Sequence, residues 1–127
     1  MLADHAPMPT LATADLARAR EFYEGTLGFT PADDVAEGVL YRAGNSSFLV
    51  YPSSFAGTNK ATSMSFNVPS GDFEAIVGDL RGKGVDFDTF DLPVGTWTDG
   101  VADFGNGMKG VWFTDPDGNI LNVDTMG

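Results

Sequence analysis

The stretch VWFTDPDGNILNV, at residues 111–123, joins two apolar segments through a turn. Pro116 presets the first backbone angle of that turn, and Gly118 supplies the positive φ that completes it. The flanking segments, 111–114 and 120–123, contain β-branched and aromatic side chains, which favour strands. The stretch therefore predicts two antiparallel strands near the end of the chain.

A similar pair of strands is predicted earlier in the chain. Residues 38–43 and 47–51 are apolar segments on either side of Gly44-Asn45, a favourable hairpin turn. Residues 8–14 predict a strand before them. Asp15 is a suitable N-cap for a helix with one apolar face that ends at Gly28.

The second half repeats this order of elements. Residues 63–68 alternate as a strand does, residues 70–72 offer helix caps, and Gly84 ends the apolar stripe of the helix. Residues 85–89 alternate again and predict a further strand. Residues 91–109 are rich in Asp and Gly and predict a loop.

The repeat defines an α+β fold in a single domain, residues 1–127. We expect module one at about 8–52, a linker at 53–61 and module two at about 62–125. One helix for four strands covers only one face of each sheet. The other faces are expected to curl around a cavity, where a ligand would bind.

Composition excludes several classes of partner. The chain carries 18 acidic and 7 basic residues, a net charge of −11, which repels nucleic acid and anionic membranes. It holds no cysteine, so disulfides and thiolate chemistry are excluded, and a cytoplasmic location is weakly favoured. Neither a signal peptide nor a membrane-spanning run is apparent. The acidity favours solubility and attracts cations.

The motifs Asp15-Leu16 to Phe22-Tyr23, Leu27-Gly28-Phe29 and Asp115 to Ile120 occur in an order that resembles the vicinal oxygen chelate superfamily. This superfamily includes glyoxalases, extradiol dioxygenases and bleomycin-resistance proteins. The resemblance covers nearly the whole chain. It implies two βαβββ modules forming curled mixed sheets around a cavity, and a homodimer.

The resemblance also implies four metal-ligand positions, which here hold poor ligands. They fall on Met8, on Leu49 or Tyr51, on Ser63, and on Asn122. Zinc, iron and manganese prefer imidazole or carboxylate donors. We therefore expect no metal and no other cofactor, and a neutral ligand-binding pocket lined by these residues.

The segment 91–109 supplies the remaining candidates. Trp97 either stacks on a ligand, with the segment acting as a lid, or anchors a long loop to the core. Asp99, Asp103 and Tyr41 are the weak candidates for catalysis.

Three functions remain open. The first is a metal-independent protein of the glyoxalase/bleomycin-resistance type that sequesters or carries an organic molecule, cationic or aromatic. The alternative is a glyoxalase-like lyase or isomerase, metal-free or with atypical metal ligands. The third is a structural or regulatory protein that binds a partner, which predicts a filled cavity and an exposed apolar patch.

Overall fold

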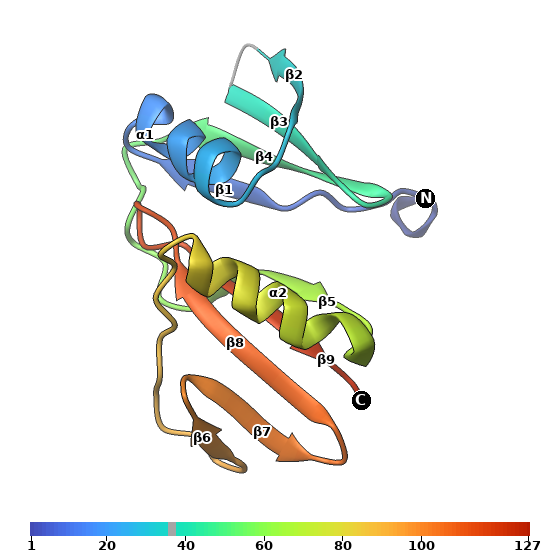
Figure 1. Cartoon of the computed structure of the whole chain (residues 1–127). Coiled ribbons are helices and arrows are strands. Elements are labelled where there is room, and N and C mark those ends of the chain that lie inside the picture. Colours follow the sequence, from blue (N-terminus) through green and yellow to red (C-terminus); the bar gives the residue numbers. More distant parts are fainter. Residues whose placement is uncertain (36–37) are drawn as a thin grey trace.

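The computed structural model describes residues 1–35 and 38–127 and contains two sheets (Figure 1). The first sheet has the strand order β1-β4-β3-β2 and the second β5-β9-β8-β7-β6. Both sheets are mixed, because β1 pairs with β4 and β5 with β9 in parallel while the other pairs are antiparallel. The two sheets remain separate and do not close into a barrel. Their combination with helices α1 and α2 confirms the predicted α+β class.

The first group of elements follows a one-turn helix, η1 (Leu2–Asp4). It comprises β1 (Thr10–Thr13), α1 (Leu16–Arg20), η2 (Glu21–Thr26), β2 (Pro31–Val35), β3 (Gly38–Ala43) and β4 (Ser46–Pro52). The Asp15 carboxylate accepts a hydrogen bond from Arg18 N at 3.1 Å, which confirms the predicted N-cap. The helix widens into a π-type turn at η2 and ends before Gly28, whose φ is +81°.

The second group comprises β5 (Thr62–Asn67), α2 (Ser70–Gly82), β6 (Thr96–Thr98), β7 (Val101–Gly105), β8 (Met108–Thr114) and β9 (Ile120–Thr125). Helix α2 follows Pro69, which has no side-chain acceptor, so the caps expected at residues 70–72 are not used. Asp72 lies in the first turn, where its charge favours the helix.

Two sequence predictions in this half are wrong. The segment 91–109 is not a loop, because it contains β6, β7 and the start of β8. Its Asp99-Gly100 and Asn106-Gly107 pairs all have positive φ, as two-residue hairpin turns require. The segment 85–89 is not a strand. Asp88 N donates to Trp112 O at 2.7 Å, at a part of β8 that β7 does not reach, but residues 85–89 do not continue this contact into a paired strand.

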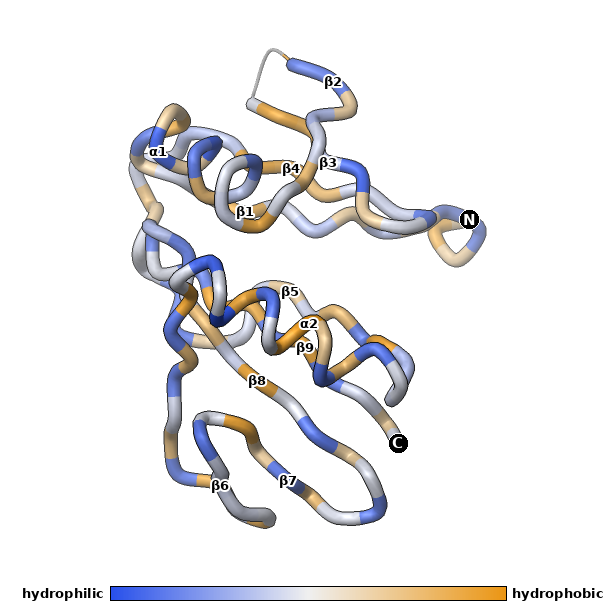
Figure 2. Tube along the Cα trace, in the orientation of Figure 1, coloured by the Kyte–Doolittle hydropathy of each residue, from blue (hydrophilic) through white to orange (hydrophobic). Residues whose placement is uncertain are grey.

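The helix-covered faces of both sheets share one core. Tyr23 of η2 packs on Tyr41 and Phe48 of the first sheet, with ring centroids 5.8 and 5.6 Å away. The second sheet contributes Val111 and Phe113, and Figure 2 shows apolar and polar residues alternating along β8. The opposite faces of the two sheets lie outside this core, and we call them the outer faces.

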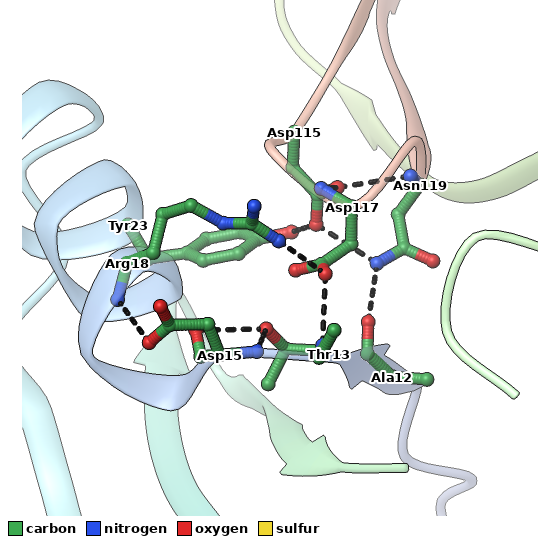
Figure 3. Close-up of polar contacts among 9 residues, drawn as sticks. Ala12, Thr13, Asp15, Arg18, Tyr23, Asp115, Asp117 and Asn119 are labelled. Carbon is green, nitrogen blue, oxygen red and sulfur yellow. Dashed lines mark hydrogen bonds and ion pairs between the residues drawn. The ribbon is translucent and has the colours of Figure 1, made fainter. Parts of the chain in front are cut away.

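A buried polar junction joins the turn between β8 and β9 to the first module (Figure 3). Asp115 Oδ2 accepts from the Tyr23 hydroxyl at 2.7 Å, and Asn119 Nδ2 donates to Ala12 O at 2.8 Å. Asp117 Oδ1 accepts from Ala14 N and from Arg18 Nη2. The turn predicted from residues 115–119 therefore also holds the two modules together. Within the described residues, no helix is long and apolar enough to cross a bilayer.

Candidate functional site

The outer face of the first sheet carries two of the predicted ligand-contacting residues. Leu49 lies opposite Thr10, and Tyr51 lies opposite Ala12, in the parallel register of β1 and β4. Side chains paired in this way point to the same side of a sheet. Both Leu49 and Tyr51 are half-buried, while Met8 precedes β1 and is 43% exposed.

The outer face of the second sheet carries an aromatic wall, formed by Phe90, Trp97 and Trp112. The three rings meet edge to face, with centroids 5.0 to 6.1 Å apart. Trp97 Nε1 donates to Phe90 O at 2.8 Å. Trp97 itself lies in β6 and not in a loop, and it anchors the segment before β6 to the outer face of the sheet, where its side chain is half-buried.

Asn122 lies beneath this wall. Its register partner in β8 is Trp112, its side chain is nearly fully buried, and its Nδ2 donates to Val111 O at 3.1 Å. A Cβ built on Gly110 would lie 3.3 Å from Trp112 Cη2 and 3.5 Å from Asn122 Nδ2. Because Gly110 has no side chain, the indole of Trp112 can lie over this part of the sheet.

A hollow of about 430 Å³ adjoins the wall. Phe90, Trp112 and Ile120 supply its apolar lining, and Lys60 and Asp88 supply opposite charges. Partial burial raises the pKa of Asp88, and the nearby Asp86 carboxylate raises it further. The site thus offers ring surfaces for stacking and a carboxylate at its edge.

The architecture and the sequence together match a known family. The family model described as Glyoxalase/Bleomycin resistance protein/Dioxygenase superfamily matches residues 4–123. The chain belongs to this superfamily.

Several solved structures share the fold at low sequence identity. Lactoylglutathione lyase from Agrobacterium tumefaciens is 16% identical, with a TM-score of 0.71 and coverage of 95% of this chain and 93% of that one. Fosfomycin resistance protein FosX from Mesorhizobium loti is 14% identical (TM-score 0.67, 98% and 93%), and oxidase ChaP-H2 is 21% identical (0.70, 97% and 94%). The chain has no significant match among curated proteins.

The four positions that the resemblance assigns to metal ligands offer neither a carboxylate nor an imidazole, since they hold Met8, Leu49 or Tyr51, Ser63 and Asn122. Leu49 has no donor atom, the Ser63 hydroxyl accepts from Asn59 Nδ2 at 2.7 Å, and Asn122 is buried against backbone. Among the described residues, no three His, Cys, Asp or Glu side chains are grouped closely enough to hold a metal ion. The donor chemistry therefore offers nothing to offset the dehydration of a divalent cation.

The predicted ligand-contacting residues form two separate groups. Met8, Leu49 and Tyr51 belong to the first sheet or its approach, whereas Ser63, Trp97 and Asn122 belong to the second. Ser63 sits at an irregularity between Thr62 and Met64 in the pairing of β5 with β9.

The three candidates for catalysis do not line the hollow beside the aromatic wall. The Tyr41 ring is in the core, and its hydroxyl donates to Glu24 Oε2 at 2.8 Å. Burial raises the pKa of Tyr41, and this hydrogen bond raises it further. Asp99 is in the turn between β6 and β7, where its carbonyl accepts from Arg81, and the Asp103 carboxylate accepts from Gly105 N.

From the sequence, neither Phe90 nor Trp112 was assigned a ligand contact. The signal for Trp112 is its alternation with Val111 and Phe113, which places it on the face of Asn122. Phe90 carries no such signal, because it lies outside any strand and joins the wall through tertiary packing.

Proposed function

We propose that this chain is a metal-independent small-molecule binding protein of the glyoxalase/bleomycin-resistance type, which sequesters or carries an organic ligand. The aromatic wall of Phe90, Trp97 and Trp112 is the observation that carries this proposal. Large ring surfaces on an outer sheet face favour a planar or aromatic ligand.

Charge favours a cationic ligand. The chain has a net charge of −11, and Asp88 lines the hollow that adjoins Phe90 and Trp112. A cation at this edge gains from the carboxylate and from the ring faces together. Lys60 lines the same hollow, and its positive charge opposes the attraction of a cationic ligand.

A homodimer is part of the proposal. Each outer face is a separate surface within one chain, so a ligand on the wall contacts only the second sheet. A second copy that places its first sheet over this wall would enclose the ligand between Leu49 or Tyr51 of one chain and Trp112 of the other. Sedimentation equilibrium in the presence of ligand tests this point. A chain that stays monomeric when the ligand concentration is 100-fold above its Kd contradicts the homodimer.

Titration calorimetry against planar cationic and planar neutral molecules tests the binding role. Trp112→Ala removes one of the three rings of the wall and is expected to weaken binding by about tenfold or more, or about 1–3 kcal/mol. Phe55→Ala is the matched control, because Phe55 is an exposed aromatic residue outside the strands and outside the wall. Equal losses in both variants, or no binding below millimolar concentration across the panel, would contradict the proposal.

A metal assay tests whether ligand binding is independent of a metal ion. Extensive dialysis against a chelator is expected to leave ligand affinity unchanged, because residues 49, 51, 63 and 122 offer no carboxylate or imidazole. One equivalent of tightly bound zinc, iron, nickel or manganese would overturn the metal-independent role.

A lyase or isomerase activity is the second candidate, and Asp88 is the observation that favours it. A carboxyl group with a raised pKa beside a hollow is suited to proton transfer. Turnover that is lost in Asp88→Asn while ligand binding persists would select this candidate over the binding role.

A further inference from the structure

A second pocket lies on the opposite side of the second sheet, where the two modules meet. Its volume is about 190 Å³. Leu27 and Phe29 line it from the first module, and Phe66, Ile76 and Leu80 line it from the second. Phe113 closes its floor, on the face of β8 opposite to Trp112.

The lining of this pocket suits an apolar occupant. A buried water needs two to four polar partners, and the side chains just named supply none. Leu27, Phe29, Phe66 and Ile76 are only partly buried, so their apolar surfaces face the pocket while remaining accessible to a ligand. Filling the pocket would remove these surfaces from water.

The size of the pocket limits the ligand to one ring. An apolar cavity of about 150 Å³ accepts benzene. A pocket of about 190 Å³ therefore holds one six-membered ring with a short substituent.

One charge selects the substituent. Asp79 of α2 is the charged residue in the lining, and Lys83 Nζ contacts its Oδ2 at 3.1 Å. Both partners of this ion pair are well exposed, so the pair is weak and easily exchanged. An ammonium group on the ligand would meet the Asp79 carboxylate, while a carboxylate would be repelled.

From the volume, the apolar lining and Asp79, we infer that this pocket is a second ligand site, for a single-ring apolar molecule with a short amino side chain. The site is independent of the aromatic wall, because the two lie on opposite faces of the second sheet. It also spans both modules, since Phe29 stacks on Phe66 with a centroid distance of 5.9 Å. A bound ligand therefore stabilises the contact between the modules.

Benzylamine is the probe, with toluene and benzoate for comparison. Calorimetry is expected to give a Kd of about 1 mM or below for benzylamine, at least tenfold tighter than for benzoate. Methyl NMR shifts are expected at Leu27, Ile76 and Leu80, and saturation raises Tm. No binding at about 10 mM, or shifts confined to Leu49 and the tryptophans, would overturn the inference.

Variants separate this site from the aromatic wall. Ile76→Phe fills the pocket and is expected to abolish benzylamine binding, while Ile76→Val retains it. Asp79→Asn is expected to weaken benzylamine at least threefold and leave toluene unchanged. Trp112→Ala is expected to leave the benzylamine-induced methyl shifts at Leu27, Ile76 and Leu80 unchanged, because these residues line the second pocket and not the wall. Failure of the proposed function and failure of this inference are therefore distinguishable.

A second copy of the chain is the competing occupant. In that case the Leu27 and Leu80 methyl shifts would follow protein concentration and resist benzylamine, which would overturn the ligand site.

Discussion

Tyr23 places a hydroxyl in the buried junction between the modules. The residue is fully buried, and its hydroxyl donates to Asp115 Oδ2 at 2.7 Å. Burial and the Asp115 charge raise the pKa of Tyr23, so the hydroxyl remains a donor across the accessible pH range. This hydrogen bond joins the first module to the turn between β8 and β9.

Tyr23→Phe is expected to lower the free energy of unfolding by about 1.5–3 kcal/mol, because it removes a hydrogen bond to a charged group. Urea unfolding measures the change. Tyr51→Phe, on the half-buried outer face, is the matched control and is expected to change it by less than about 0.5 kcal/mol. Similar losses in both variants would remove the junction bond as a source of stability.

Asp88 is expected to make the stability of the chain depend on pH. Its folded-state pKa is raised by desolvation and then by Asp86, so the ionised form is disfavoured in the folded chain. Its contribution to stability is present below the ordinary aspartate pKa of about 4 and is lost as the pH rises through the folded-state value.

Asp88→Asn is therefore expected to raise the free energy of unfolding at pH 7, by less than about 1 kcal/mol because Asp88 is exposed. The difference from the parent chain is expected to disappear near pH 3. Urea midpoints at the two pH values measure this, and a difference that grows on acidification would contradict the assignment.

Among the elements, β3 depends on a glycine at its start. A Cβ at Gly38 would lie 2.1 Å from Val50 O, a backbone atom of the paired strand β4. Gly78, in the middle of α2, has open space around the same position and ordinary helical geometry. The same substitution therefore has opposite effects in the two elements.

Gly38→Ala is expected to destabilise the chain by about 1–3 kcal/mol, through a clash that forces β3 and β4 apart. Gly78→Ala is expected to stabilise it by about 0.5–1 kcal/mol, since alanine is the better helix former. Thermal unfolding of both variants checks the pair. A tolerated Gly38→Ala would mean that the β3–β4 spacing is not fixed.

Elements with a clear local signal were predictable from the sequence. The Asp15 cap, the Gly28 stop and the strands around Gly44-Asn45 follow from neighbouring residues alone. Strands β6 and β7 were missed because Asp and Gly were counted as loop composition, whereas Asp99-Gly100 is a hairpin turn. The apolar alternation at 85–89 reflects packing of Val85 and Phe87 on the sheet, without strand pairing.

The candidate site was predictable only in part. Alternation places Leu49, Tyr51 and Asn122 on the outer faces. The aromatic wall was not predictable as a unit, because its three rings come from a coil segment and two non-adjacent strands. Their meeting depends on how residues 83–95 cross the sheet, and no local pattern encodes that path.

At the scale of the whole molecule, charge opposes folding. A net charge of −11 on 127 residues produces mutual repulsion that is stronger in the compact state than in the unfolded chain. The Debye length falls from about 30 Å at 0.01 M salt to about 8 Å at 0.15 M.

Raising NaCl over this range is therefore expected to increase Tm by about 4 °C, which corresponds to roughly 1 kcal/mol. Differential scanning calorimetry measures the shift. A Tm that falls with salt would show that ion pairs such as Arg18–Asp117 outweigh the repulsion.

The buried junction also imposes an order on biosynthesis. Tyr23 is hydrogen-bonded to Asp115, 92 positions later in the sequence, and Ala12 to Asn119, 107 positions later. While the chain is being synthesised, the first module is complete in length but its buried hydroxyl and carbonyl lack their partners. Such distant contacts slow folding and expose intermediates. The nascent first half therefore cannot complete its junction until the last hairpin leaves the ribosome.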